Sequence, residues 1–280
     1  MANTQEEIRI LRELRKRIFI AAYRGGYANL ASCFSSLEIF YALYNKGVMN
    51  IDKSNPDFQD RDRFVLSKGH AALALYACFV DLGLMSPKTF YSYLQGDGGV
   101  GIAPNKKDSK WVDFNCGSLG HGLSAAAGMA MAFKMDDSKA NVYVMVGDGE
   151  CQEGSVYEAA MSAAAFGLDN LKLIIDCNRI QKMDFISEIS EQINFKTVWS
   201  SLGWSVDEVD GHDTGELYDA LKKPNPKGKP KLIVANTVKG KGVSIMENEP
   251  KWHFRLPNKK ELEIFKDELG IDESELLMGD

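Results

Sequence analysis

The chain has 280 residues and a mass of 31.1 kDa, enough for one large α/β domain or two small ones. Its composition, 45% hydrophobic and 26% charged residues, is that of an ordinary globular protein, and a net charge of -6 without a long basic run argues against nucleic-acid binding. The apolar runs are too short to span a membrane and the N-terminal region is too charged for a signal peptide, so we expect a cytoplasmic protein.

The first half of the chain predicts helices around one short strand. Apolar residues at three- and four-residue steps indicate the first, amphipathic helix. The expected elements are, in order, this helix ending near Gly25-Gly26, a helix from Ser36 to Gly47, a strand in RFVLSKGH at residues 63–70, the helix AALALYACFVDLG, an irregular stretch from Gly96 to Gly120, and an alanine-rich helix beginning near Leu119.

In the second half, strands and helices alternate. The strands are expected in NVYVMVGD, LKLIIDCN, WSVDEVDGHD and KLIVANTV, and the helices in SVYEAAMSAAAFGL, FKTVWSSLG and TGELYDALKK. Such alternation predicts an α/β fold, a parallel sheet with helices on both faces. We expect a single domain over residues 1–280, in which residues 241–280 form a C-terminal tail whose packing the sequence leaves open.

Polar and glycine residues follow several of these strands directly. They are Gly69-His70, Gly147-Asp148-Gly149, Asn178 and Gly211-His212-Asp213. Because ligands bind at the carboxyl ends of the strands in such sheets, these residues are candidates for one site. The dinucleotide, P-loop, hydrolase-elbow and zinc-protease motifs are all absent from the sequence.

Asp148 and Asn178 end neighbouring strands and offer a carboxylate and an amide oxygen. These are ligands for Mg²⁺ or Ca²⁺, and Mg²⁺ commonly completes its shell with substrate phosphates. The glycines beside Asp148 allow close approach of a diphosphate, and the helix expected from residues 153–155 points its amino end toward it. A Gly-Asp-Gly segment after a strand is also an ordinary turn, so by itself the motif leaves both interpretations open.

The spacing of these residues resembles the thiamine-diphosphate signature. Asn178 follows Gly147-Asp148-Gly149 after 28 residues, and Cys177 stands where the signature has a first Asn. The segments SKGHA, CGSLGHGLS, GDGECQEG, VDGHD and KGKGVSIMENEPKWH are similar, in this order, to the N-terminal, diphosphate-binding half of transketolase. The resemblance covers nearly the whole chain and implies the thiamine-diphosphate-binding (PP) fold.

The resemblance also implies roles for single residues. Asp148, Asn178 and the carbonyl of Ile180 would hold Mg²⁺, with Ca²⁺ as an alternative. The cofactor-binding residues would be His70, Gly117, Ser118, Leu119, Gly147, Asp148, Gly149, Glu150, Asn178, Ile180 and His212. The catalytic residues would be His70, His212, Glu153 and His253, with Glu153 in an acidic network that links two active sites. Phe254 stands where the WHG loop of short transketolase subunits has Gly, and His121 stands where the family has Gln.

The chain matches no motif of the pyrimidine-binding domain, which carries the glutamate needed to activate the cofactor in this family. The resemblance therefore implies one subunit of a split transketolase, which transfers a two-carbon ketol unit from a ketose to an aldose. A partner chain would supply the pyrimidine-binding and C-terminal domains, with two copies of each chain in the assembly.

Two departures from the family concern the substrate end of the site. Asn29, in the segment ANLASCFS at residues 28–35, and Ala103, in IAP, stand where the family has histidines. These changes remove hydrogen-bonding and proton-carrying groups, so the sequence leaves the donor and acceptor open and favours a non-standard or carrier-linked sugar. The alternatives are a non-catalytic interaction or regulatory subunit, and the α subunit of a 2-oxo acid dehydrogenase.

Overall fold

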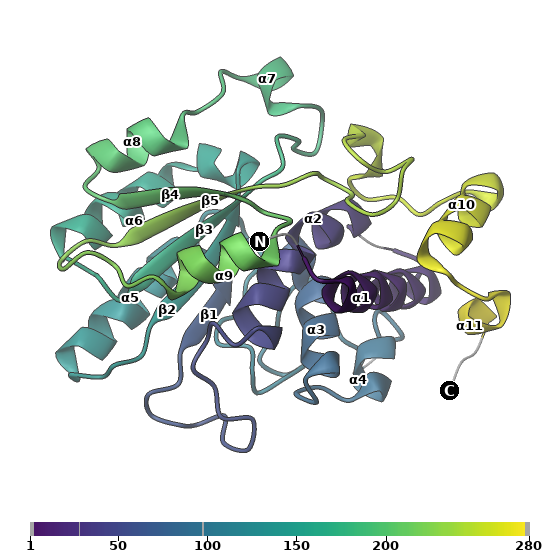
Figure 1. The fold of residues 1–280 in the computed structure, drawn as a ribbon, viewed down its shortest axis with the longest axis horizontal. Coiled ribbons are helices and arrows are strands. Elements are labelled where there is room, and N and C mark those ends of the chain that lie inside the picture. The colour runs from purple at the N-terminus through teal and green to yellow at the C-terminus, as the bar shows by residue number, and fades with distance from the viewer. Residues whose placement is uncertain (1–2, 28, 97, 278–280) are drawn as a thin grey trace.

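A computed structural model describes residues 3–27, 29–96 and 98–277, so that Ala28 of the ANLASCFS segment lies outside the described residues. The chain forms one five-stranded sheet in the order β1-β2-β3-β5-β4, and every neighbouring pair of strands is parallel. Helices cover both faces of this sheet (Figure 1). The predicted α/β architecture is confirmed.

The strands lie where the sequence places them. They are β1 (Arg63–Leu66), β2 (Val142–Gly147), β3 (Leu171–Cys177), β4 (Ser205–Asp210) and β5 (Lys231–Asn236). The inner strands β2, β3 and β5 are almost fully buried because helices cover both of their faces, which explains their continuous apolar runs. β4 is the half-exposed edge strand, and three of its six residues are acidic.

The helices are more numerous than the sequence predicts. They are α1 (Gln5–Gly25), α2 (Leu30–Phe40), which continues as a π-helical turn (Tyr41–Asn45), α3 (Ala72–Asp81), α4 (Pro87–Tyr91), α5 (Gly122–Met135), α6 (Gly154–Ala165), α7 (Ile186–Ile189), α8 (Phe195–Ser201), α9 (Thr214–Lys222), α10 (Lys259–Leu269) and α11 (Glu273–Leu277). The expected start of α2 at Ser36 is wrong, because the helix begins at Leu30. Every residue of α2 is buried, so its first turns lack the polar face that marks an amphipathic helix.

Two hydrophobic cores lie on opposite faces of the sheet. Alternate strand residues such as Phe64 and Met145 pack with α1, α2, α3, α9 and α10, on what we call the α1 face. Their neighbours Val65 and Val144 pack with α5, α6 and α8, on what we call the α6 face. This division follows from the period of two residues along a strand.

The chain leaves the carboxyl ends of the strands toward both faces. After β1 it enters α3 on the α1 face, whereas after β2 and β3 it enters α6 and α8 on the α6 face. After β4 and β5 it returns to the α1 face, through α9 and the buried residues Val243 and Met246. The direction of exit therefore changes twice across the sheet, between β1 and β2 and again between β3 and β5, and such switch points create crevices for ligands.

The segment after Gly240 packs against the N-terminal helix. Trp252 and Phe265 are fully buried in the core of the α1 face, and the ring of Phe265 stacks on Phe19 of α1 with centroids 4.8 Å apart. α10 and α11 lie beside α1 (Figure 1). The structure thus describes the packing of residues 241–277, which the sequence leaves open.

Within the described part of the chain, no helix combines the length and apolar character needed to cross a membrane.

Candidate cofactor site

A cavity of 290 Å³ opens at the carboxyl ends of β1, β2 and β3, beside the first switch point. It is lined by Ser32, Lys68, His70, Leu119, Gly147, Asp148, Gly149, Glu150, Gln152, Glu153, Asn178, Ile180, Gln181, Lys182, Lys239 and His253. We call it the first cavity. It brings together most of the residues that the sequence selects, from strand ends that are far apart along the chain.

Asp148 is buried at the base of the first cavity, at the end of β2. Its carboxylate accepts hydrogen bonds from the backbone N–H groups of Gly149, at 2.8 Å, and Arg179. Burial, together with the charge of Asp176, nevertheless raises the pKa of Asp148 to about 6. The carboxylate is therefore short of positive charge, and a bound divalent cation would supply it.

The other two expected metal ligands lie in the same cavity. The Asn178 side-chain oxygen accepts a hydrogen bond from the Ile180 N–H at 3.2 Å, and the Ile180 carbonyl accepts one from the Lys239 ammonium at 2.6 Å. Among the described residues, no group of three or more His, Cys, Asp or Glu side chains could hold a metal ion. Any metal here must therefore use the mixed set of carboxylate, amide and carbonyl oxygens, which suits a hard cation.

A fully buried ion pair supports the floor of the first cavity. The Lys68 ammonium contacts the carboxylate of Asp176, which also accepts hydrogen bonds from Ser35, at 2.8 Å, and Thr237. Burial opposes ionisation of Asp176, but Lys68 and the hydroxyl donors outweigh it and hold the pKa of Asp176 well below its usual range. Asp176 also accepts from the Asn178 amide at 3.2 Å, so the pair orients a candidate metal ligand.

Glu150 holds the loop before α5 against the end of β2. Its carboxylate accepts hydrogen bonds from Gly120 N–H at 2.8 Å, from Gly147 N–H at 3.1 Å and from the Ser67 hydroxyl. Burial raises the pKa of Glu150 in spite of these donors. Glu150 thus positions the turn that carries Leu119, and its carboxylate oxygens are already used by protein donors.

Two histidines and a lysine of the lining, His70, His253 and Lys239, lie close together. The rings of His70 and His253 lie 5.7 Å apart, and His253 Nδ1 is 3.1 Å from the Lys239 ammonium. Burial and then the nearby charge of Lys239 lower the pKa of His253 to about 3, and burial and then Lys68 lower the pKa of His70 well below its ordinary value. Both imidazoles are therefore neutral near pH 7.

The structure does not bring three of the expected residues into the first cavity. Gly117 and Ser118 are exposed on the loop before Leu119, outside its lining. His212 lies beyond Thr237, where its Nδ1 is 3.1 Å from Glu38 and its Nε2 accepts the Val238 N–H at 2.8 Å. Both ring nitrogens are occupied, so His212 fastens the chain after β5 to α2.

A buried hydroxyl tests whether the first cavity suits a polar group. Ser32 is 1% exposed and lines the cavity, yet its Oγ has no hydrogen-bond partner in the structure. A buried hydroxyl without a partner lowers the free energy of unfolding by about 1–3 kcal/mol unless a ligand or water forms a hydrogen bond with it. Together with the buried Asp148 carboxylate, it makes the residues present a good fit to a metal-bound diphosphate.

The residues that depart from the family lie at the edge of this site. Asn29 is buried and donates from Nδ2 to the carbonyl of His253 at 2.9 Å. Ala103 packs beside the residue that precedes His70, since a Cβ placed on Gly69 would lie 3.3 Å from the Ala103 Cβ. Asn29 thus fastens two segments of the chain together, and Ala103 presents only a methyl group.

Sequence reasoning missed several lining residues of the first cavity. Lys68 and Lys239 occur in the quoted segments SKGHA and KGKGVS, but a lysine in a soluble protein is usually exposed. Ser32 lies in the segment that departs from the family. Only the structure, in which its hydroxyl is buried without a partner, marks it as a candidate site residue.

Several known proteins resemble this chain in sequence. The family profile described as "Transketolase, thiamine diphosphate binding domain" matches residues 6–278. An apulose-4-phosphate transketolase subunit from Actinobacillus succinogenes is 36% identical, over 91% of this chain and 92% of its own length. The 6-deoxy-6-sulfo-D-fructose transketolase subunit SqwG of a Clostridium species is 38% identical, over 80% of this chain and 82% of its own length.

Solved structures of longer proteins share the fold. A transketolase from Leishmania mexicana superposes with a TM-score of 0.84 and 25% identity, over 99% of this chain but 44% of its own length. A transketolase from Campylobacter jejuni gives a TM-score of 0.83 and 27% identity, over 94% of this chain and 43% of its own length. The chain therefore spans less than half of these longer proteins.

Proposed function

The chain belongs to the transketolase family, as a member of its thiamine-diphosphate-binding domain, and from this premise we propose that it is the diphosphate-binding subunit of a two-subunit transketolase. In this proposal the whole chain acts as a single domain. It binds thiamine diphosphate with Mg²⁺, and it transfers a two-carbon ketol unit from a ketose to an aldose only when a partner supplies the pyrimidine-binding domain. The observation that carries the proposal is the buried Asp148 carboxylate, which shares the first cavity with Asn178 and Ile180.

Three oxygen ligands of this chain would hold the metal ion: the Asp148 carboxylate, the Asn178 amide and the Ile180 carbonyl. The Lys239 ammonium, which now donates to that carbonyl, has a pKa lowered to about 8 by burial and then by Lys68. Lys239 is therefore the group that must give way or turn toward the diphosphate when the metal binds. The hydroxyl of Ser32, which has no partner in the structure, would donate a hydrogen bond to the bound group.

Thiamine diphosphate supplies a thiazolium carbon that serves as nucleophile and electron sink beside the sugar carbonyl. The neutral imidazoles of His70 and His253 can then accept or donate a proton at a sugar hydroxyl, which is a role for a neutral rather than a charged ring. The buried ion pair of Lys68 and Asp176 would help to fix the position of these two histidines. Glu153, exposed at the start of α6, would join an acidic network with a neighbouring subunit, and its exposure supports this role.

Several observations support a substrate other than an ordinary pentose phosphate. Ala103 and Asn29 leave the rim of the site without two imidazoles, and the Asn29 amide is already used by the carbonyl of His253. The two short relatives are named for apulose 4-phosphate and for a sulfonated fructose, so related subunits act on different anionic sugars. We therefore infer a modified or carrier-linked anionic sugar as substrate.

The deciding experiment compares Asp148→Asn with Glu208→Gln in the complex purified from its own cells with Mg²⁺ and thiamine diphosphate. Native mass spectrometry should show a second chain and bound cofactor, in a complex with two copies of each chain. Asp148→Asn should keep the partner but weaken Mg²⁺-dependent cofactor binding by at least about 100-fold, because it removes the charged metal ligand. Glu208 is an exposed acid on the edge strand, and its variant should bind cofactor like the unchanged protein.

An Asp148→Asn complex that binds thiamine diphosphate as tightly as the unchanged protein would overturn the proposed metal site. A homo-oligomer without partner and without cofactor, under conditions that preserve other complexes, would overturn the split-enzyme proposal as a whole.

A further inference from the structure

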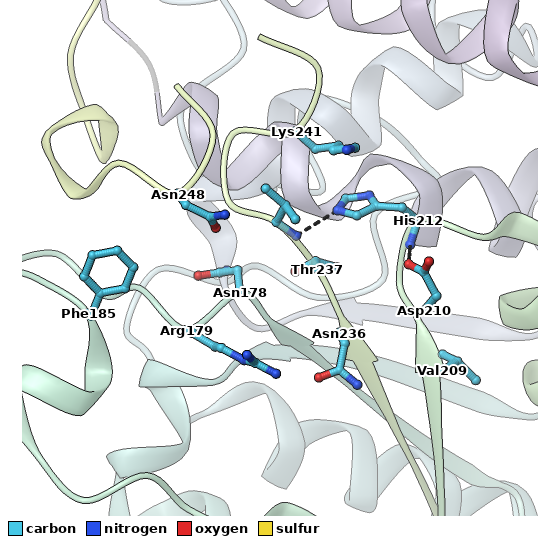
Figure 2. A pocket seen from close by; sticks show the side chains of 11 residues that line it. Asn178, Arg179, Phe185, Val209, Asp210, His212, Asn236, Thr237, Lys241 and Asn248 are labelled. Carbon is cyan, nitrogen blue, oxygen red and sulfur yellow. Dashed lines mark hydrogen bonds between the residues drawn. The ribbon is translucent and has the colours of Figure 1, made fainter. Parts of the chain in front are cut away.

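A second and larger cavity, of 840 Å³, lies at the other switch point of the sheet, between the carboxyl ends of β3 and β5 (Figure 2). We call it the second cavity. The two cavities share a single lining residue, Asn178. The second cavity is therefore separate from the first, and it forms where the chain leaves β3 and β5 toward opposite faces of the sheet. Its volume lies in the range of small-molecule sites.

The second cavity is lined by polar side chains that have few partners in the protein. Within the described residues, the side-chain amides of Asn236 and Asn248 form no hydrogen bond, and the guanidinium of Arg179 forms no ion pair, its one polar side-chain contact being the weakly accepting Cys177 sulfur. The Arg179 side chain extends toward Asn236 across the ends of β3 and β5 (Figure 2). These groups are therefore available to a ligand.

The charge of the second cavity is positive. Arg179 and Lys241 are its cations, and Lys241 is only loosely compensated by Glu247 at 3.6 Å. The one acidic side chain in the lining is Asp210, whose carboxylate already accepts the N–H of His212 at 2.8 Å. An anionic ligand is favoured, and the planar fork of arginine matches phosphate oxygens in particular.

The remaining lining groups suit a sugar. The free amides of Asn236 and Asn248 can each donate to and accept from hydroxyl groups. Phe185 presents a ring at the opposite side of the cavity from Asp210 (Figure 2), and a half-buried ring can cover the apolar face of a sugar or base. We propose that the second cavity is a binding site for a phosphorylated sugar, either free or as part of a nucleotide.

In this site the Arg179 guanidinium pairs with the phosphate, and the amides of Asn236 and Asn248 bind the hydroxyl groups. The backbone of Arg179 serves the first cavity through its N–H to Asp148, whereas its side chain turns away into the second. Substitution of this side chain therefore separates the two sites experimentally.

The test is calorimetric titration of the full chain, saturated with thiamine diphosphate and Mg²⁺, with ribose 5-phosphate, AMP and ribose as probes. One equivalent of a phosphorylated probe should bind, and ribose alone should bind at least about tenfold more weakly, because a charged hydrogen-bonded pair is lost. Tighter binding of AMP would identify a nucleotide as the natural source of the phosphate, and tighter binding of ribose 5-phosphate a free sugar phosphate.

Arg179→Ala and Asn236→Ala should each weaken binding of the phosphorylated probe by at least about tenfold. Arg179→Lys, which keeps the charge but loses the fork, should weaken it less and guards against loss of fold in the alanine variants. Lys227→Ala removes an exposed cation outside the second cavity and should leave binding unchanged.

His70→Ala separates this proposal from the proposed function, because His70 lines only the first cavity. It should weaken thiamine-diphosphate binding and leave ribose 5-phosphate binding intact. The proposal for the second cavity is overturned if neither phosphorylated probe binds at millimolar concentration, if Arg179→Lys and both alanine variants bind as tightly as the unchanged chain, or if His70→Ala abolishes binding of the phosphorylated probe.

Discussion

The charged side chains beneath the first cavity are buried far more completely than such groups usually are. Lys68 and Asp176 expose 2% and 0% of their side chains, and each depends on the other for compensation of its charge. A buried pair of this kind contributes little net stability, but the loss of one partner leaves an isolated charge in the interior. The pair therefore serves to position its neighbours. Replacing both side chains by apolar residues should destabilise the chain far less than replacing one of them.

We predict that Asp176→Leu destabilises the ligand-free chain by about 3–5 kcal/mol, because the Lys68 ammonium loses its counter-charge. The double variant Lys68→Met/Asp176→Leu should lose much less than the sum of the two single variants. Urea unfolding followed by circular dichroism measures all three. Additive losses would show that the two side chains do not act as a pair.

The low pKa of His253 predicts a pH dependence. Since its pKa is about 3 in the folded chain and about 6.5 when unfolded, protons favour the unfolded state between these values. The contribution of this half-buried ring to stability should therefore be full above pH 6.5 and fall as the pH drops toward 4, by up to about 1 kcal/mol after allowance for solvent screening.

The comparison for His253 uses His253→Asn, which keeps a polar side chain but cannot take up the proton. Urea unfolding of the ligand-free chain at pH 7 and pH 5 should show a smaller difference for this variant than for the unchanged protein. An equal difference in both proteins would remove His253 as a source of the pH dependence.

Among single residues, the sequence identifies site residues that follow strands more readily than site residues that lie inside helices. Asp148 and Asn178 stand at strand ends, where the fold places ligands, so their position makes them candidates before any resemblance is considered. Ser32 and Lys68 gain their meaning from burial, which depends on how α2 packs over β1 and β3. His212 is the opposite case. Its motif selects it as a site residue, but both of its ring nitrogens already have partners in the protein.

At the scale of elements, α5 shows how one helix can carry two glycines with opposite roles. A Cβ on Gly122, in its first turn, would lie 2.4 Å from the Cβ of Ser67, which follows β1. A Cβ on Gly128, in the same helix, would meet nothing within 4 Å. The first glycine lets the helix approach the strand end, and the second is exposed and only lowers helix propensity.

We predict that Gly122→Ala destabilises the chain by about 1–3 kcal/mol through this overlap, whereas Gly128→Ala stabilises it by about 0.5–1 kcal/mol. Thermal unfolding of the isolated chain compares the two directly, since they make the same chemical change in one helix. Equal effects of both variants would show that helix propensity, and not contact with β1, governs Gly122.

The missed helices have a physical explanation. α4 and α7 have only 5 and 4 residues, too few to show a period of 3.6 in the sequence. α10 carries a capping box at Asn258 and Glu261 and is capped by Gly270, and these are the usual sequence signals of a helix. The alternating strands were predicted well because each is a buried apolar run of ordinary length.

At the scale of the whole molecule, the contacting helices α5 and α6, with the residue that ends α6, expose several large apolar side chains. Met131, Met135, Met161 and Phe166 expose 38%, 77%, 51% and 60% of their surface. The two helices contact each other on the α6 face of the sheet, next to Glu153. We therefore expect this surface to contact the second copy in the proposed assembly, which has two copies of each chain.

We predict that Met161→Lys combined with Phe166→Lys lowers the mass of the assembled complex measured by light scattering, because the charges must be buried at the contact. The far-ultraviolet circular dichroism spectrum should stay the same. Leu277→Lys changes a side chain that is 78% exposed on α11 and should not alter the mass. An unchanged mass for the double variant would place the second copy elsewhere.

Arg179, finally, contributes to both cavities. Its peptide N–H holds Asp148, its φ of 65° is one that few residues adopt, and its side chain reaches the neighbouring hollow. An occupant that displaces this peptide would alter cofactor affinity, and thermodynamic linkage requires the cofactor to alter the affinity for that occupant by the same factor. Such reciprocity would let the supply of one metabolite set the fraction of subunits that carry their cofactor.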